Sequence, residues 1–270
     1  MEDNMDNETM VTIANYTNPF EAGIAKSLLE DLGFEVVLLN ERMMSMYSSI
    51  AGDMYMIELQ VSAEHELEAK RILTELEDSD FVNHILKSEE ALLEGHFQLT
   101  SGKHSGQYIE KIKLLQNPEA THDICKRMAE RLADYEFDCV VGPAYGGIVL
   151  AFQTALVMHK SFIFTQRKDG EMSIRSGFDL SKLKKVAVIE DILSTGGSIN
   201  EVLACLKENN IEVAVIGVLV DRSGGKLQFP APLESLLCLE IPAWEADDCE
   251  LCKQGIPLHR PGSSDKKPTA

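Results

Sequence analysis

The fold of this chain is decided by one stretch, Val186-Ala187-Val188-Ile189-Glu190-Asp191-Ile192-Leu193-Ser194-Thr195-Gly196-Gly197-Ser198-Ile199. An apolar run ends in two carboxylates, and a turn rich in hydroxyl groups and glycine leads from there into a helical pattern of apolar residues. This order predicts a buried parallel strand, a ligand-binding loop and the start of a helix. Free backbone N–H groups and the positive end of the helix dipole make such a turn a site for anions such as phosphate.

The two acids, Glu190 and Asp191, limit the kind of anion that can bind here. They would repel a phosphate unless the same ligand also carried hydrogen-bond donors or a cation. A ribose 5-phosphate meets this condition, because its hydroxyl groups can donate to the acids while its phosphate lies in the turn. The segment lacks the lysine of a P-loop and a G-x-G-x-x-G pattern, so the commoner phosphate loops do not fit. The alternative is an ordinary strand, turn and helix with a serine or threonine cap.

Apolar residues, two acids, a short spacer and Thr-Gly-Gly-Ser follow one another in this segment. The segment resembles the motif of type I phosphoribosyltransferases that binds 5-phosphoribosyl 1-pyrophosphate (PRPP). The resemblance implies that the acids hold the ribose hydroxyls and stabilise positive charge on the sugar, while the turn holds the 5′-phosphate. Mg2+ is the implied cofactor, carried by PRPP, with Asp191 as a candidate protein ligand. The residues implied here in PRPP binding are Glu190, Asp191, Ser194, Thr195, Gly196, Gly197 and Ser198.

The stretch from Gly95 to Ile109 indicates which base would be transferred. Its pattern, Phe-x-Leu-x-Ser-Gly-x-x-Ser-x-x-Tyr, is similar to the substrate segment of orotate phosphoribosyltransferases. The Asp-Arg pair that ends at Arg222 is similar to the arginine that faces orotate in that family. The resemblance therefore implies an orotate site formed by Ser194, Arg222 and Tyr108, the last covering the planar base. The alternatives are a β-hairpin with a Ser-Gly turn for the first segment and a surface salt bridge for Arg222.

Two more segments resemble parts of a PRPP site. The turn at Tyr145 and Gly146 follows a predicted strand and opens a helix, and in the family such a turn holds pyrophosphate through backbone N–H groups. The stretch from Thr165 to Arg175 looks like the mobile loop that closes over the site of the partner subunit in a homodimer. Arg167 and Lys168 in that stretch would neutralise the leaving pyrophosphate, as catalytic residues beside Glu190 and Asp191. A plain strand-to-helix turn and a solvated hairpin are the respective alternatives.

The chain departs from the usual orotate enzymes in three ways. Thr100 stands where many have lysine, Gly146 stands where many have a second lysine, and the loop lacks a further lysine and a histidine. Lys103, His104 and Arg175 are the candidates to compensate. The predicted reaction converts orotate and PRPP into orotidine 5′-phosphate and pyrophosphate, in pyrimidine biosynthesis. A phosphoribosyltransferase for another base, such as a purine, and a PRPP-sensing regulatory protein with little turnover remain alternatives.

Charge and hydropathy exclude several other classes of protein. The net charge of −19 argues against a nucleic-acid partner, because phosphate neutralisation needs a basic face. The acidic N-terminus has no apolar core of a secretory signal. The nearly uncharged stretch from Cys139 to Met158 is interrupted by Gly142-Pro143 and Gly146-Gly147, so it is not expected to span a membrane. A cytoplasmic enzyme is predicted.

The chain has six cysteines. Four lie in apolar or helical contexts and are expected to be small core residues. Cys249-Glu-Leu-Cys252 is a lone C-x-x-C pair, which is half of a zinc site. Free thiols in a reducing compartment are the default interpretation. The alternative is that the two-fold axis of a dimer joins two such pairs around one metal ion.

Residues 10–77 are predicted to form a separate small α+β domain that resembles a short prokaryotic domain regarded as signal-transducing. Its helix begins at a cap on Asn18 and ends at Gly33. The loop Asn40–Asp53 is expected to be a flexible hairpin connection, and Ser62 is expected to cap a second helix that ends at Leu76. The strands are expected at Val11–Ala14, Phe34–Leu39 and Met54–Val61.

An acidic link, Glu77–Asp80, is predicted to lead into a helix at Phe81–Leu93 and a larger domain at residues 82–262. A helix around Glu119–Ala133 and short apolar strands at Val140, Phe162, Val186, Val213 and Leu236 alternate as in α/β domains with a mostly parallel sheet. The resemblance names this architecture the type I phosphoribosyltransferase fold. Its ligands should bind beyond the carboxyl ends of the strands. Residues 263–270 are expected to be a disordered tail.

Overall fold

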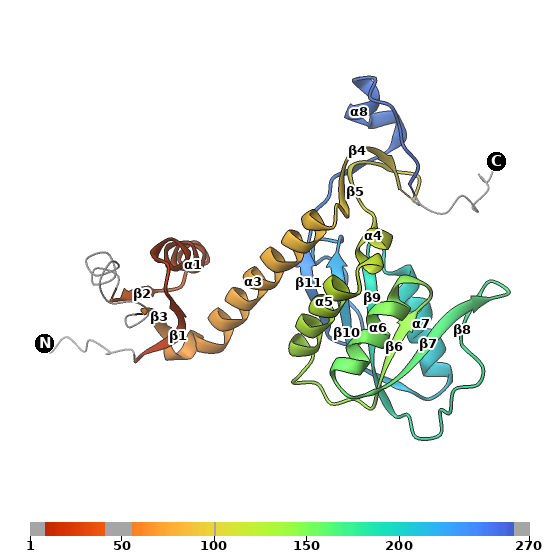
Figure 1. Ribbon diagram of the computed structural model, residues 1–270, viewed down its shortest axis with the longest axis horizontal. Coiled ribbons are helices and arrows are strands. Elements are labelled where there is room, and N and C mark those ends of the chain that lie inside the picture. The colour runs from red at the N-terminus through yellow and green to blue at the C-terminus, as the bar shows by residue number, and fades with distance from the viewer. Residues whose placement is uncertain (1–8, 41–55, 100, 262–270) are drawn as a thin grey trace, which may run out of the picture. The chain divides into compact units, whose positions relative to one another are not determined.

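The computed structural model describes residues 9–40, 56–99 and 101–261. The chain divides into two compact units, Met1–Glu77 and Asp78–Ala270. Figure 1 labels most of their elements and colours the chain from the N-terminus to the C-terminus. The predicted tail at 263–270, and all but the first residue of the predicted hairpin connection at 40–53, lie outside the described residues.

The first unit is a three-stranded antiparallel sheet, in the order β1-β3-β2, with a helix packed on it. Asn18 caps that helix as predicted, because its side chain accepts a hydrogen bond from the backbone N–H of Phe20. Gly33 follows the helix with a φ of 93°, a conformation that favours glycine. The elements are β1 (Met10–Tyr16), α1 (Pro19–Asp31), β2 (Val36–Leu39), β3 (Ile57–Ser62) and the 3-10 helix η2 (Ala63–His65).

The core of the first unit follows the alternation of its central strand. Ile57, Leu59 and Val61 of β3 are completely buried, as the period of two in the sequence predicts. Leu59 and Val61 pack against Leu29 of α1. Ser62 stands before η2 but makes no capping hydrogen bond with its side chain, so the prediction of a cap there is wrong.

The predicted acidic link between the two units is also wrong. Helix α3 (Glu66–Ser88) runs without a break through residues 77–80. Asp78 is buried and forms ion pairs with Arg131 at 3.1 Å and Arg127 at 3.6 Å, so two arginines from a later helix compensate its charge. The acids therefore do not mark a solvated linker. The same helix supplies Leu73 to the core of the first unit and Leu86 to the core of the second.

The second unit is built on a six-stranded sheet in the order β11-β10-β9-β6-β7-β8. All neighbouring strands are parallel except the edge pair β7 and β8. The five strands predicted for this domain are confirmed, and β8 is an addition that sequence reasoning took for a loop. The strands are β6 (Cys139–Pro143), β7 (Ser161–Lys168), β8 (Glu171–Ile174), β9 (Lys185–Leu193), β10 (Glu212–Asp221) and β11 (Leu233–Cys238).

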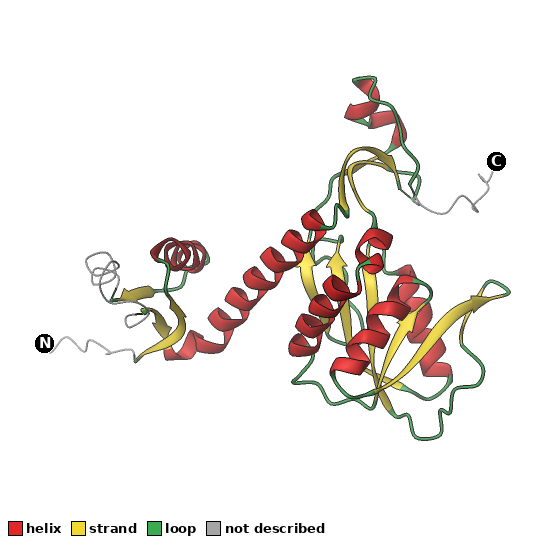
Figure 2. Cartoon of the chain, in the orientation of Figure 1, coloured by secondary structure: helices red, strands yellow, loops and turns green. Residues whose placement is uncertain are grey.

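Helices cover both faces of this sheet (Figure 2). Ala187 and Ile189 of β9 belong to the core on the side of α5 and α6, whereas Val186 and Val188 belong to the core on the side of α7. A strand buried on both faces is apolar at successive positions, which explains the continuous apolar run in the sequence. The helices are α4 (Lys111–Gln116), α5 (Pro118–Arg131), α6 (Gly146–Val157) and α7 (Gly197–Glu208).

A second, smaller sheet of the same unit has the order β12-β5-β4 and is antiparallel. It contains the stretch from Gly95 to Ile109, which forms a hairpin in which the N–H of Leu99 donates to the carbonyl of Lys103 at 2.8 Å. The helix predicted at Phe81–Leu93 therefore ends earlier, at Ser88. The remaining elements are β4 (Leu92–Gln98), β5 (His104–Ile109), β12 (Ala243–Trp244), the 3-10 helix η3 (Ala246–Asp248) and α8 (Glu250–Lys253).

Across the residues that the structure describes, no helix has both the length and the apolar character needed to cross a bilayer. The uncharged stretch after Cys139 is strand β6 followed by the core helix α6, as the glycine interruptions predicted.

The packing of α3 yields a stability prediction. Leu86 is completely buried in the second unit, so Leu86→Ala should lower the free energy of unfolding of that unit by about 2–5 kcal/mol. The fluorescence of Trp244, the single tryptophan, reports unfolding of this unit in denaturant. Leu67→Ala on the same helix is the control, because Leu67 is 84% exposed and its loss should cost less than about 0.5 kcal/mol. Equal effects of the two substitutions would contradict the packing of α3 in the second unit.

Candidate active site

The carboxyl ends of three neighbouring strands bring most of the predicted site residues to one edge of the larger sheet. Glu190 and Asp191 lie near the end of β9, and Arg222 directly follows β10, where its N–H donates to the carbonyl of Leu193 at 2.7 Å. The turn at Gly146 follows β6, which pairs with β9 on the other side. Parallel strands end at the same edge of a sheet, so residues distant in the sequence meet here.

The two acids are buried, with 6% of Glu190 and 4% of Asp191 exposed. The N–H of Asp191 donates to Oε1 of Glu190 at 3.0 Å, and the N–H of Ile192 donates to Oδ1 of Asp191 at 2.7 Å. The hydroxyl of Ser198 donates to Oε2 of Glu190 at 3.1 Å. The carboxylates are thus held in fixed positions beside the start of α7.

Lys111 supplies the positive charge that these two acids require. Its Nζ lies 2.6 Å from Oδ2 of Asp191. Burial alone would lower the pKa of Lys111, but the negative charge of Asp191 and the hydrogen bond to it outweigh this and raise the pKa. Sequence reasoning missed this residue. The signal in the sequence is weak: a lysine that follows Tyr108 by three positions, at the start of a helix too short to give a periodic pattern.

Gly146 explains one departure from the usual orotate enzymes. A Cβ at this position would collide with the carboxylate of Asp191 and lie 3.3 Å from Nζ of Lys111. The turn between β6 and α6 thus passes directly over the acids, and no side chain fits at position 146. The carboxylate of Asp191, with Lys111 beside it, occupies the place that a side chain at 146 would take. Of the candidates to compensate, Lys103 instead pairs with Glu245 at 2.9 Å.

The turn at residues 194–198 leaves the start of α7 open. Gly196 is the N-cap residue, with a φ of 76° that favours glycine, and no side chain caps this helix. Ser194 and Thr195 are exposed, and the Ser198 hydroxyl bonds to Glu190. The alternative of a serine or threonine cap is therefore wrong. The backbone N–H groups of the first turn of α7 are available to an anion.

Arg222 and Tyr108 lie close enough to influence each other's ionisation. Burial lowers the pKa of the half-buried Arg222, and Tyr108 partly offsets this. Burial raises the pKa of Tyr108, then Glu110 adds to the rise while Lys111 and Arg222 oppose it. The Nε of Arg222 is buried and has no hydrogen-bond partner among the described residues. The alternative of a surface salt bridge is therefore wrong for the described part of the chain, and this guanidinium can receive an anionic ligand.

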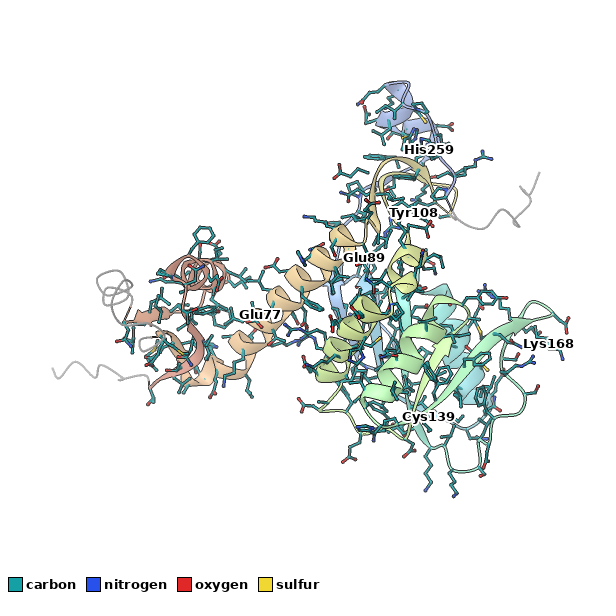
Figure 3. The ribbon with its side chains drawn as sticks, viewed as in Figure 1. Glu77, Glu89, Tyr108, Cys139, Lys168 and His259 are labelled. Atoms are coloured by element: carbon teal, nitrogen blue, oxygen red, sulfur yellow. The ribbon has the colours of Figure 1, made fainter. Side chains whose placement is uncertain are left out.

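Arg167 and Lys168 are the predicted site residues that the structure does not bring to the acids. The stretch from 165 to 175 forms the β7–β8 hairpin. A solvated hairpin was the alternative to a mobile loop that closes over the site. Arg167 makes a bidentate pair with Glu201 of α7, with distances of 2.9 and 2.8 Å. Lys168 is exposed toward the outer end of the hairpin (Figure 3). Tyr145 is also exposed, and its backbone carbonyl accepts a hydrogen bond from the N–H of Ile148 at the start of α6.

Comparison with known proteins agrees with this geometry. A model of the phosphoribosyl transferase domain matches residues 112–247, and one named "Putative prokaryotic signal transducing protein" matches residues 10–77. The fold and the acid pair beside an open helix start thus define a phosphoribosyltransferase. The Thermotoga maritima orotate phosphoribosyltransferase is 44% identical over 182 residues, which are 67% of this chain and 97% of that relative. The enzyme of Chlorobium phaeobacteroides is 45% identical over 179 residues, 66% of this chain and 93% of the relative.

One solved structure is similar to this chain in fold. The UMP synthase of Leishmania donovani superposes with a TM-score of 0.52 and 25% identity, covering 66% of this chain and 41% of that longer one. The chain thus spans less than half of the length of that protein, but nearly the full length of the two orotate phosphoribosyltransferases named above. The chain belongs to the orotate phosphoribosyltransferase family.

The buried acid pair makes a prediction about pH. Burial first, and then the charge of Asp191, raises the pKa of Glu190. The pKa of Glu190 in the folded state is therefore higher than the value of about 4.3 in the unfolded chain. The stability that protonated Glu190 contributes is complete below the unfolded pKa and is lost as the pH rises through the folded pKa. Glu190→Gln removes this loss. Its free energy of unfolding relative to the wild type should therefore rise between about pH 5 and pH 8, as measured by urea titrations.

Glu240→Gln serves as the matched control for this pH series. Glu240 is exposed, and its hydrogen bond and ion pair with Lys226 lower its pKa. A lowered pKa keeps the group ionised above about pH 5, so its substitution should give a flat difference over the same range. A flat difference for Glu190→Gln as well would show that Glu190 ionises like an ordinary carboxyl group.

Proposed function

We propose that this chain transfers the 5-phosphoribosyl group of PRPP to orotate, giving orotidine 5′-phosphate and pyrophosphate for pyrimidine nucleotide synthesis. The observation that carries the proposal is the buried pair Glu190 and Asp191, held beside the open start of α7 in a chain of this family. In the reaction, the bond between C1′ and the pyrophosphate oxygen breaks, and a bond from a ring nitrogen of orotate to C1′ forms. The sugar should pass through an oxocarbenium-like state, as in other glycosyl transfers.

Each end of PRPP meets suitable groups in the proposed site. The 5′-phosphate would accept hydrogen bonds from the first backbone N–H groups of α7 and from the hydroxyls of Ser194 and Thr195. The ribose hydroxyls would donate to the oxygens of Glu190 and Asp191, and the negative charge of Asp191 would also stabilise the developing positive charge at C1′. Lys111 would turn from Asp191 toward the pyrophosphate, or remain to keep the carboxylate fixed while the backbone at Gly146 holds the diphosphate.

The donor set of the site fits a magnesium ion carried by the substrate. Carboxylate oxygens are suitable Mg2+ ligands, but Oδ1 of Asp191 accepts an N–H and Oδ2 is paired with Lys111. Asp191 would therefore bind the ion only after Lys111 moves, and the oxygens of PRPP would hold it otherwise. When bound, Mg2+ would help to disperse the charge of the leaving pyrophosphate.

The orotate ring is assigned to the space near Tyr108 and Arg222. The unpartnered Nε of Arg222 supports this assignment, because a planar guanidinium binds a carboxylate in a directed way. Burial of part of the tyrosine ring supports a role in covering a flat base. Ser194 would complete the orotate site from the neighbouring turn.

A homodimer is part of the proposal. Arg167 and Lys168 lie on an exposed hairpin and do not contact the acids of their own subunit, which fits a role over the pyrophosphate of a partner subunit. Val149, Phe152 and Leu156 form an exposed apolar stripe along α6, at a spacing that places them on one face of the helix. Such a stripe is suited to burial between two subunits.

The proposed location is the cytoplasm, and the proposed partners are small molecules. A cytoplasmic enzyme is supported by the six cysteines, which form no disulfide. Small-molecule substrates are the proposed partners, since a chain with a net charge of −19 is poorly suited to nucleic acid.

Orotate consumption provides the direct test of the function. We expect the ultraviolet absorbance of orotate to fall only when protein, PRPP and Mg2+ are all present. Omission of PRPP or of Mg2+ should abolish the change, and adenine or guanine should not replace orotate. Binding of PRPP by folded protein without any turnover would favour the regulatory alternative. Turnover of a purine in preference to orotate would favour the other alternative.

Asp191→Asn tests the assignment of the acid pair. Loss of this charge removes both the stabilisation of C1′ and the partner of Lys111, so turnover should fall by about 100-fold or more while the circular dichroism spectrum is unchanged. Asp138→Asn is the matched control. Asp138 accepts backbone N–H groups from Lys184 and Lys185 at the opposite end of β9, so its substitution should leave turnover near normal. Near-normal turnover in Asp191→Asn would remove Asp191 from the mechanism.

A further inference from the structure

Four side chains able to bind a metal ion meet beside the smaller sheet of the second unit. His96 lies on β4, His104 lies on β5, and Cys249 and Cys252 lie at the start and within the single turn of α8. Their nitrogen and sulfur atoms all lie within 4.8 Å of one another. His96, His104 and Cys249 are buried, and Cys252 is exposed. None of the four belongs to the proposed PRPP or orotate site.

Four of the six separations between these atoms are close to those of a tetrahedron around one ion. With Zn–S near 2.3 Å and Zn–N near 2.0–2.1 Å, ligand atoms lie about 3.4 Å apart for two nitrogens and about 3.6 Å apart for nitrogen and sulfur. Nε2 of His96 and Nδ1 of His104 are 3.1 Å apart. The Sγ of Cys252 lies 3.3 Å from Nδ1 of His104 and 3.7 Å from Nε2 of His96. The Sγ of Cys249 lies 3.4 Å from Nε2 of His96.

The hydrogen bonds around His96 also favour a metal ion. Its Nδ1 lies 2.8 Å from the carbonyl oxygen of Ile256 and must donate to it, because a carbonyl only accepts. In the neutral ring this leaves Nε2 without a hydrogen and with one lone pair. Nε2 faces three groups, His104, Cys249 and Cys252, and can accept a hydrogen from only one of them. A cation at the centre would bind all four groups. Histidine ligands of metal ions typically donate their other ring N–H to a carbonyl or carboxylate, as Nδ1 of His96 donates to the carbonyl of Ile256.

Backbone hydrogen bonds of the hairpin and of the C-terminal segment bring these residues together, independently of contacts between the four side chains. Gln98 lies opposite His104 in the β4–β5 hairpin, so His96 and His104 come to neighbouring positions of the sheet. The N–H of His259 donates to the carbonyl of His96 at 2.7 Å, which holds the C-terminal segment against β4 (Figure 3). The spacing of three residues in one helical turn places both cysteines on the same side of α8. The ligands are therefore positioned before an ion binds.

We propose that His96, His104, Cys249 and Cys252 bind one structural Zn2+ ion within a single chain. Two thiolates and two imidazoles suit tetrahedral zinc, and four protein ligands leave no open position for catalysis. The default interpretation of these cysteines as free thiols is replaced, and so is a site shared across a dimer axis. The two missing ligands come from histidines of the same chain, more than a hundred residues away.

The ion would fasten the C-terminal segment to the hairpin that carries Tyr108. The smaller sheet has little apolar core of its own, and its strand β12 has only two residues. Small structures of this kind are commonly stabilised by a metal. The site does not depend on the proposed reaction, because zinc content and turnover are measured separately.

Metal analysis of the full-length chain tests the proposal. The protein is purified without an affinity tag that binds metal, in the presence of a reductant, and its zinc is measured by mass spectrometry. We expect about one zinc per chain, falling below about 0.2 in Cys252→Ser and in Cys249→Ser. Cys238→Ser is the matched control, because Cys238 is an exposed cysteine outside the cluster, and it should keep about one zinc. Cobalt exchanged into the wild type should give a sulfur-to-cobalt charge-transfer band and the intense visible bands of a tetrahedral site.

The outcomes are distinct. Folded, reduced wild-type protein that holds no zinc and takes up neither zinc nor cobalt overturns the proposal, as does a disulfide between Cys249 and Cys252 in such protein. Equal zinc in Cys252→Ser and Cys238→Ser also overturns it. Should Cys249→Ser fail to fold, the exposed Cys252 and the cobalt spectrum of the wild type still decide the question. Zinc in a chain that does not consume orotate would support the metal site while the proposed function fails.

Discussion

The ion pair between Lys111 and Asp191 is the interaction on which the site depends. Two adjacent carboxylates buried at the end of a strand repel each other and lose hydration, and either effect favours protonation. The lysine offsets one charge directly, and the Ser198 hydroxyl and backbone N–H groups bind the other oxygens. The result is a pair of acids held rigidly, with raised pKa at Glu190, in front of a helix start that attracts anions. A ligand with a phosphate at one end and hydroxyl donors beside it matches this charge pattern.

Close backbone approach is the second condition that shapes the site. The turn after β6 can pass over the acids only because position 146 has no side chain. A Cβ at that position would collide with the carboxylate of Asp191, and the positive charge beside the acids comes from Lys111 of α4. The alternative of a regulatory protein without turnover rested partly on missing cationic groups, and Lys111 supplies one such group beside the acids.

Several parts of the molecule could be predicted from local sequence patterns, and others could not. The strands around Val140, Phe162, Val186, Val213 and Leu236 were predictable, because strands buried on both faces are continuously apolar. The link at residues 77–80 was mistaken for a solvated segment, because its charges resemble a linker. In the structure Asp78 is neutralised by Arg127 and Arg131, which lie about fifty residues further along the chain. Local charge does not reveal a distant partner.

The sequence by itself determined the strand, turn and helix around Glu190 and Asp191, the α/β architecture and the type of ligand, because these depend on neighbouring residues and on periodic burial. Only the tertiary structure decided that Lys111 pairs with Asp191, that Arg167 pairs with Glu201, and that two histidines lie beside the C-x-x-C pair. The physical reason is the same in each case. Strand order and register fix which distant segments become neighbours, and no local pattern of hydrophobicity or charge encodes that choice.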